Sequence, residues 1–176
     1  MEIRHYIFII VIIIACSCNN SQIQGPVEKK IIADKMVDIN KFLVEKDNEQ
    51  INKFIDSQNL EMVQTQSGLW YNIIRKGTGA NFVDGNSVTI DYSSSLLDGT
   101  KCYSSTERGD KVVVISKSDI ESGLNEGLKL LNPGSEAMFI LPPYLAFGLL
   151  GDGKNIPARS VIVYNVKVKM AESLLE

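Results

Sequence analysis

The sequence predicts an α+β protein in which short strands form a single antiparallel sheet around one short helix, preceded by a helical segment. Two observations predict this class. Between Ser67 and Met170, several short runs of residues alternate between apolar and polar, which is the pattern of half-buried antiparallel strands. One run, residues 119–131, instead has the three- and four-residue spacing of a helix. The sequence contains no visible internal repeat.

The amino-terminal segment has the features of a targeting signal. Residues 7–15 read IFIIVIIIA, an apolar run that is too short to cross a bilayer, which takes about 20 residues. It has the length of a signal-peptide apolar region. The stretch Ile13-Ile14-Ala15-Cys16 looks like a bacterial lipobox, in which the cysteine is acylated and becomes the first residue. We expect residues 1–15 to be a lipoprotein signal peptide and Cys16 to carry the lipid. Cys18 is a second candidate, and an ordinary secretory signal or an uncleaved anchor is the alternative.

A lipid at Cys16 would attach the protein to a membrane without a spanning helix. We therefore expect a location in the cell envelope, on the outer membrane and facing the periplasm. The polar residues that follow, up to residue 26, have the composition of a flexible tether.

Residues 27–60 form a helical lead with apolar residues at mixed three- and four-residue spacing. Asp47 and Gln50 are spaced as a capping pair, which predicts a helix over about 48–58. The pattern leaves open whether residues 30–46 form a separate helix. We expect a surface helix that packs through one narrow apolar face, so that its removal costs modest stability. A dimerisation arm is the alternative role.

The elements after the lead follow from local patterns. Alternation predicts strands at residues 69–74, 88–93 and 162–170. A β-branched run predicts another at residues 111–115, and a further strand is expected at residues 136–141. Asp98-Gly99 predicts a hairpin turn. The helix over 119–131 has Asp119 as a candidate N-cap. A long loop is expected over residues 142–159.

Composition excludes several classes of function. The net charge of −3 gives no electrostatic reason to expect nucleic acid as a partner. The only histidine, His5, lies in the predicted signal peptide, which excludes His-dependent triads and His-ligated metal sites in the mature chain. Cys102 is the only cysteine in the folded part, so no internal disulfide forms.

Two local acidic motifs are expected to have structural roles only. Gly151-Asp152-Gly153 lacks the spaced acidic ligands of a calcium loop and is expected to be a turn. Glu121 and Glu126 are expected to be solvated helix charges.

Six short segments occur in a characteristic order. They are Val88-Thr89-Ile90-Asp91-Tyr92, Leu97-Asp98-Gly99-Thr100, Ser104-Ser105, Gly123-Leu124-Asn125-Glu126-Gly127-Leu128, Leu141-Pro142-Pro143-Tyr144-Leu145-Ala146-Phe147-Gly148, and Asn155-Ile156-Pro157 with residues 161–166. Together they resemble the FKBP class of peptidyl-prolyl cis–trans isomerases along the whole stretch from about Ser67 to Met170. With the lipobox and the helical lead, the variant Cys102-Tyr103-Ser104-Ser105 looks most like the gliding-motility-associated lipoproteins of this class.

The resemblance implies an FKBP-like domain over residues 61–176, with a curved antiparallel sheet wrapped around one short helix and a hydrophobic pocket that receives a proline side chain. It implies catalytic roles for Tyr92, Phe147 and Tyr164. The implied substrate-binding residues are Cys102, Tyr103, Val112, Ile120, Glu121, Leu124 and Ile156. It implies neither a cofactor nor a metal.

Four of these positions depart from the family's usual pattern. Cys102 stands where Phe is usual, Tyr103 where Asp is usual, Glu121 where an aliphatic residue is usual, and Leu124 where Trp is common. We therefore expect a weak peptidyl-prolyl isomerase that acts on proline-containing segments of exported proteins. The alternatives are a non-catalytic chaperone or assembly module of the same fold, and a purely structural lipoprotein.

Overall fold

The computed structural model describes residues 26–169, and the chain divides into two units after Lys41. Its helices are α2 (Pro26–Ser57), α3 (Ser105–Arg108), α4 (Ser122–Lys129) and the 3-10 turn η1 (Pro143–Leu145). Its strands are β1 (Val63–Gln64), β2 (Trp70–Arg75), β3 (Ser87–Leu96), β4 (Lys101–Ser104), β5 (Lys111–Val114), β6 (Glu136–Leu141) and β7 (Ile162–Val168). The predicted fold class is confirmed.

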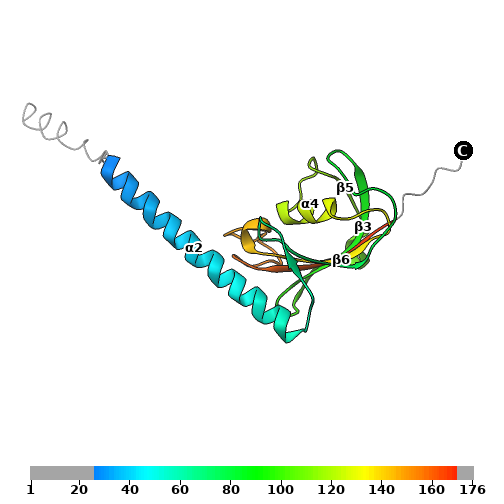
Figure 1. The fold of residues 1–176 in the computed structure, drawn as a ribbon, viewed down its shortest axis with the longest axis horizontal. Coiled ribbons are helices and arrows are strands. Elements are labelled where there is room, and N and C mark those ends of the chain that lie inside the picture. Colours follow the sequence, from blue (N-terminus) through cyan, green and yellow to red (C-terminus); the bar gives the residue numbers. More distant parts are fainter. Residues whose placement is uncertain (1–25, 170–176) are drawn as a thin grey trace, which may run out of the picture. The chain divides into compact units, whose positions relative to one another are not determined.

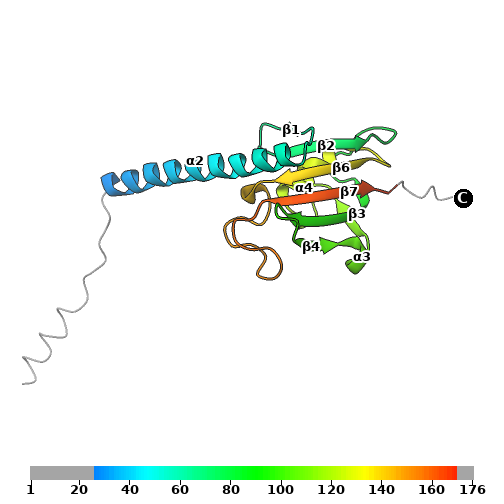
Figure 2. The same cartoon turned by 90° about the horizontal axis from the view of Figure 1, so that it is seen from below.

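The strands form one antiparallel sheet in the order β1-β2-β6-β7-β3-β4, with β5 also paired to β3 (Figures 1 and 2). The long strand β3 organises the sheet, because it pairs with β7 along one edge and with β5 and β4 in succession along the other. The predicted hairpin joins β3 to β4. Gly99 there has a φ of 86°, a conformation that glycine adopts without strain, and the Asp98 side chain accepts a hydrogen bond from the Thr100 N–H at 2.9 Å.

Helix α4 covers the inner face of the sheet, and the main hydrophobic core lies between them (Figure 1). Leu124 and Leu128 of α4 and Phe139 of β6 are almost fully buried in this core. On β7 the inward residues, such as Tyr164, are buried while Asn165 is exposed, which is the alternation that the sequence predicts.

Helix α4 is shorter than its sequence pattern suggests, and Asp119 does not cap it. The helix begins at Ser122, with Glu121 in the N-cap position and no side-chain cap bond. The N–H of Ile120 donates to the Ser118 carbonyl at 3.0 Å, so the residues around Asp119 form a tight turn ahead of the helix.

Helix α2 is continuous from Pro26 to Ser57, so the predicted helix start near residue 48 is wrong. Asp47 is not a cap. Its side chain is 8% exposed and pairs with Arg159, with 2.5 Å between Oδ1 and Nη2. This partner lies far along the sequence, in the long loop before β7. A local capping pattern carries no information about such a tertiary ion pair.

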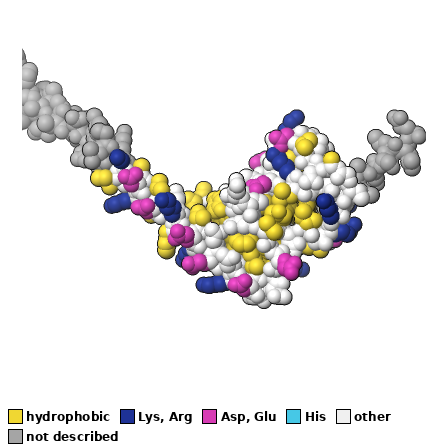
Figure 3. All heavy atoms as spheres, in the orientation of Figure 1, with side chains coloured by type: hydrophobic (Ala, Val, Ile, Leu, Met, Phe, Trp, Pro, Cys, Tyr) yellow, Lys and Arg dark blue, Asp and Glu magenta, His cyan; other side chains and the backbone are white. Residues whose placement is uncertain are grey.

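The part of α2 before Phe42 exposes large apolar side chains, including Ile31, Met36 and Ile39 (Figure 3). Its role as a dimerisation arm stays a prediction. No helix within residues 26–169 has the length and apolar character needed to cross a membrane. The predicted signal peptide and Cys16 lie outside the described residues.

The part of α2 in the second unit contributes to a second hydrophobic cluster, on the outer face of the sheet. Ile51 and Ile55 pack there with Ile140 of β6 and Val163 of β7. The Ile51 side chain is completely buried. The apolar contact of the lead is therefore larger than the sequence suggests, and removing these turns is expected to cost more than a modest amount of stability.

Substituting Ile51 measures this contribution. Ile51→Ala should lower the free energy of unfolding by about 2–5 kcal/mol, because it leaves a cavity between α2 and the sheet. Ile39→Ala is the matched control on the same helix, since Ile39 is 55% exposed, and it should change stability by less than about 0.5 kcal/mol. Urea unfolding of the full chain checks both values. Equal effects of the two substitutions would contradict the assigned packing of α2.

Candidate functional site

A groove of about 510 Å³ opens beside the start of α4. Ile120, Ala146 and Phe147 give it apolar walls, and Tyr92 of β3 and Tyr164 of β7 add two aromatic rings. Their ring centroids lie 6.3 Å apart with the planes tilted by 43°. The rest of the lining is polar and consists of Tyr103, Arg108, Lys111, Asp119, Glu121, Asp152 and Lys154.

Tyr103 and Asp152 form a polar pair at one side of the groove. The Tyr103 hydroxyl donates a hydrogen bond to Asp152 Oδ2, and the Arg108 guanidinium lies 3.7 Å from the centroid of the Tyr103 ring. Asp152 Oδ1 also accepts the backbone N–H groups of Lys154 at 2.9 Å and Ile156 at 2.8 Å. The phenol is therefore held by a loop and by a cation, and its hydroxyl is already engaged.

The ionisation of this pair follows from its hydrogen bonds. Burial raises the pKa of Asp152, but the bonds from the Tyr103 hydroxyl and from the N–H groups of Ile156 and Lys154 outweigh it and lower the pKa to about 2. The same carboxylate raises the pKa of Tyr103. At neutral pH the groove thus presents a phenol bonded to a carboxylate.

Glu121 and Tyr164 form a second polar pair. The buried Tyr164 hydroxyl donates to Glu121 Oε1 at 2.7 Å. Burial, followed by the Glu121 charge, raises the pKa of Tyr164 far above its usual range. Glu121 is therefore not a freely solvated helix charge, which corrects the expectation from its spacing. Glu126 accepts a hydrogen bond from the Ser67 hydroxyl, 2.6 Å from Oε2, at a site away from the groove.

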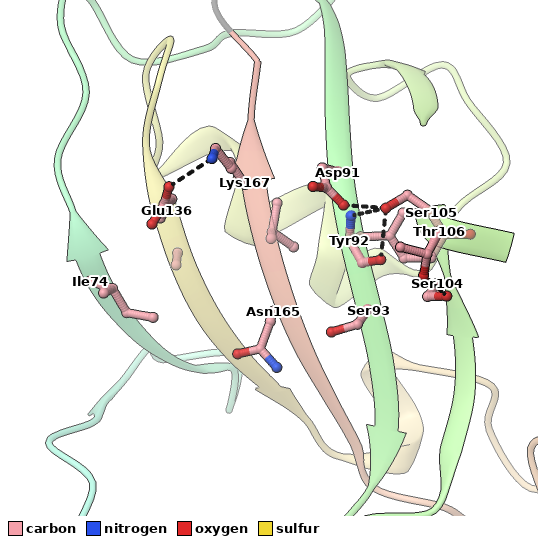
Figure 4. Close-up of a pocket in the computed structure, with 12 residues that line it drawn as sticks. Ile74, Asp91, Tyr92, Ser93, Ser104, Ser105, Thr106, Glu136, Asn165 and Lys167 are labelled. Atoms are coloured by element: carbon pink, nitrogen blue, oxygen red, sulfur yellow. Dashed lines mark hydrogen bonds and ion pairs between the residues drawn. The ribbon is translucent and has the colours of Figure 1, made fainter. Parts of the chain in front are cut away.

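Another hollow, of about 400 Å³, lies on the opposite face of the sheet (Figure 4). Its labelled side chains are mostly hydroxyls, amides and charged groups, and several are already engaged with one another. Ser105 Oγ bonds Asp91 and lies 3.2 Å from the Tyr92 carbonyl, while Lys167 pairs with Glu136 at 3.4 Å. Of the site residues that the family resemblance implies, this hollow contains only Tyr92, whereas the groove beside α4 contains six, so the groove beside α4 is the candidate site.

A family model for FKBP-type peptidyl-prolyl cis–trans isomerases matches residues 79–169. The chain belongs to this family. The FKBP-type isomerase FkpA of Aeromonas hydrophila is 38% identical over 108 residues, which cover 61% of this chain and 40% of that protein. The outer membrane protein MIP of Legionella longbeachae is 29% identical over 141 residues, or 79% of this chain and 60% of that protein. This chain thus spans less than two thirds of either relative.

The solved structure of FkpA from Escherichia coli has the same fold. It superimposes with a TM-score of 0.63 at 20% identity, over 96% of this chain and 81% of that chain. This similarity concerns the fold, which agrees with the FKBP-like arrangement of sheet and helix described above.

Six of the predicted site residues line the groove beside α4: Tyr92, Tyr103, Ile120, Glu121, Phe147 and Tyr164. The others do not. Cys102, Leu124 and Ile156 are 1–4% exposed and lie in the core beneath it. Burial, followed by the charges of Asp152 and Asp98, raises the pKa of the Cys102 thiol. Val112 is 64% exposed on β5 and lies outside the groove.

Sequence reasoning missed Arg108 and Asp152. A signal for Asp152 was present, because an aspartate between Gly151 and Gly153 is typical of a turn whose side chain accepts backbone N–H groups. The turn itself was predicted. The contact of Asp152 with Tyr103 joins residues 49 positions apart, and Arg108 contacts the same ring, so neither role has a local sequence signal.

The lowered pKa of Asp152 predicts a pH dependence. The folded value of about 2 lies below the ordinary 3.8, so the ionised form is favoured by folding, and its contribution to stability is present above about pH 4 and is lost as the pH falls towards 2. At pH 6, Asp152→Asn should be less stable than wild type by up to about 1 kcal/mol, since the site is partly solvated. This difference should shrink between about pH 4 and pH 2.

Urea unfolding over a series of pH values measures this dependence. Tyr103→Phe removes one of the donors to Asp152 and should therefore move the window towards higher pH. A difference between wild type and Asp152→Asn that stays constant from pH 6 to pH 2 would contradict the assignment.

Proposed function

We propose that the protein is a peptidyl-prolyl cis–trans isomerase that binds proline-containing segments in the groove beside α4. The observation that carries the proposal is the combination of apolar and aromatic walls, Ile120, Phe147 and Tyr164, around an open groove in a chain of the FKBP family. The non-catalytic module is not favoured, because the matching family is one of isomerases.

The physical basis is the electronic structure of the amide. Rotation about an Xaa–Pro bond passes through a twisted state that breaks amide resonance, against a barrier of about 18–20 kcal/mol. The planar amide is the more polar form, and water stabilises it. Apolar walls such as Phe147 exclude water from the amide. The planar form then loses its stabilisation by water, and the twisted state is favoured relative to it. This is catalysis by differential binding, without proton transfer or a covalent intermediate.

Two polar groups are available to orient the peptide. Within the described residues, no protein group hydrogen-bonds the Tyr92 hydroxyl, which is therefore free to bind a peptide carbonyl. The backbone N–H of Glu121 stands just before the first residue of α4. In this proposal it donates to a second carbonyl, a role that its side chain does not prevent.

We propose that the activity is weak for this family. Tyr103 is neutral where a carboxylate is usual, and its hydroxyl is bound to Asp152 rather than to Tyr92. Cys102 lies in the core and provides no aromatic wall. Both differences reduce the preferential stabilisation of a twisted amide.

We also propose that the clients are exported proteins and that the chain is an envelope lipoprotein. The apolar run ending at Cys16 supports this, as does the name of the relative from Legionella longbeachae, an outer membrane protein. The lead and the Cys102-Tyr103 variant favour the gliding-motility-associated subgroup. The mass of the amino-terminal peptide, from protein purified out of native membranes, would show whether Cys16 is acylated.

Removing one apolar wall tests the proposed activity. The wild type should accelerate isomerisation of a short Xaa-Pro peptide, and Phe147→Ala should lower kcat/KM at least about tenfold, which is about 1.4 kcal/mol of transition-state stabilisation. Phe42→Ala, at a side chain that is 63% exposed in α2, is the matched control and should keep the wild-type rate.

The assay requires folded variants, as shown by thermal unfolding well above the assay temperature. A wild type that isomerises no Xaa-Pro peptide would refute the proposed function. A folded Phe147→Ala variant with full activity would remove Phe147 from the site. A parallel assay of FkpA from Aeromonas hydrophila tests whether the activity is comparatively weak.

A further inference from the structure

The Glu121 carboxylate has one oxygen in use and one unpaired. Oε1 accepts the hydrogen bond from the Tyr164 hydroxyl, which fixes the carboxylate at the groove wall. Oε2 is shielded from solvent, and no donor among residues 26–169 lies within hydrogen-bonding distance of it. No lysine or arginine of the described part of the chain forms an ion pair with this carboxylate either.

An unpaired buried acceptor is costly, and the cost is larger for a charged group than for a neutral one. Because Oε2 has almost no accessible surface in this structure, a ligand donor reaches it only when the Glu121 carboxyl group turns towards the groove, and the resulting hydrogen bond removes this cost. A cationic donor gains most, because hydrogen bonds between charged partners are about twice as strong as those between neutral groups.

The other charged residues of the groove do not serve the same purpose. Asp152 is already bonded to Tyr103, and Asp119 is exposed to solvent. Arg108 lies over the Tyr103 ring. Lys111 and Lys154 are the remaining charged residues of the lining. The groove thus holds three cationic and three anionic side chains, and its overall charge favours neither cationic nor anionic ligands. Selection by charge must therefore come from the local geometry of Glu121.

Resting on the proposed isomerase function, we propose that Glu121 is a specificity-determining residue that selects proline flanked by lysine or arginine. The basic side chain donates to Glu121 Oε2, while its methylene stem lies along the apolar wall formed by Ile120 and Phe147. The substrate class is thus a basic residue next to proline. An aliphatic side chain at position 121, which is usual in this family, has no charge with which to make this selection.

Acetylated peptides of the form Ala-Xaa-Pro-Phe, with Xaa as Lys, Gln or Glu, test this proposal on the full chain. Acetylation removes the terminal amine, which would otherwise supply a cation. Ala-Leu-Pro-Lys places the basic residue after proline, and Ala-Leu-Pro-Gln is its neutral partner. The wild type should prefer Lys over Gln at least about fivefold in kcat/KM in one of the two placements, and it should disfavour Glu.

Glu121→Gln is nearly isosteric and retains an oxygen that accepts the Tyr164 hydrogen bond, but it removes the charge and places donors where Oε2 stands. The Lys/Gln ratio should fall to about 1–2 in this variant. Glu126→Gln is the matched control, since it makes the same substitution within α4, at a side chain bonded to Ser67 and away from the groove. It should keep the wild-type ratio.

The outcomes separate this proposal from the isomerase function. Equal rates for Lys and Gln peptides in the wild type, in both placements, would overturn the specificity and leave the isomerase function standing. A Lys preference that survives in Glu121→Gln would assign it to another residue and would also overturn the proposal. If no peptide is isomerised, the isomerase function fails, and dissociation constants of the same peptides from NMR titration apply the same Lys/Gln criterion to binding.

Discussion

The close approach of α4 to β6 is the constraint on which the rest of the structure depends. A Cβ at Gly127 would lie 2.8 Å from the Phe139 ring, and one at Gly123 would lie 2.7 Å from Leu141 Cγ. Both neighbours are fully buried and have little room to move. The two glycines therefore let the helix pack directly against the sheet. In exchange, each glycine lowers the intrinsic stability of the helix relative to alanine. Side chains at either position would push the helix outward.

This approach sets the form of the groove. It places Leu124 in the core and leaves Ile120 and Glu121, just before the helix, at the groove wall. The floor is therefore made of ordinary core packing, which explains why Leu124 is buried beneath the groove rather than lining it. The residues just before α4 and those on the loop after β6 therefore remain at the groove surface, beside Tyr92 of β3, Tyr103 of β4 and Tyr164 of β7.

Polar groups in the groove follow a different arrangement from the one that the family pattern implies. The carboxylate expected at position 103 is replaced by Tyr103, and an aspartate from the loop before β7, Asp152, binds its hydroxyl. A further carboxylate enters at Glu121 and is tied to Tyr164. The groove thus has acidic groups at different places, which changes what it can bind as well as how well it can favour a twisted amide.

Local patterns were sufficient to predict much of the fold and part of the site. Alternation located β3 and β7, because on each strand the residues that face α4 are buried in the main core. The Asp98-Gly99 hairpin and the Gly151-Asp152-Gly153 turn followed from residues with specific backbone preferences. Tyr92 and Phe147 were placed by resemblance, and both line the groove.

The features that were missed depend on contacts between distant residues. The continuity of α2 through Asp47 is accompanied by an ion pair with Arg159, which lies 112 positions away. The partners of Glu121 and Asp152 are likewise distant in sequence. Val112 and Cys102 were assigned by position in a family pattern, and the local path of each strand decides which way such side chains face. The predicted lipid site at Cys16 lies outside the described residues.

The most direct test of this account is to locate proline binding. A ¹⁵N–¹H NMR titration of the full chain with an acetylated Ala-Lys-Pro-Phe peptide reports the residues that change environment. The largest shifts are expected at the backbone of Ile120, Glu121 and Phe147, with none at the hollow around Ser105 and Asn165 on the opposite face of the sheet. Shifts confined to that hollow, or the same shifts with a peptide in which alanine replaces proline, would contradict it.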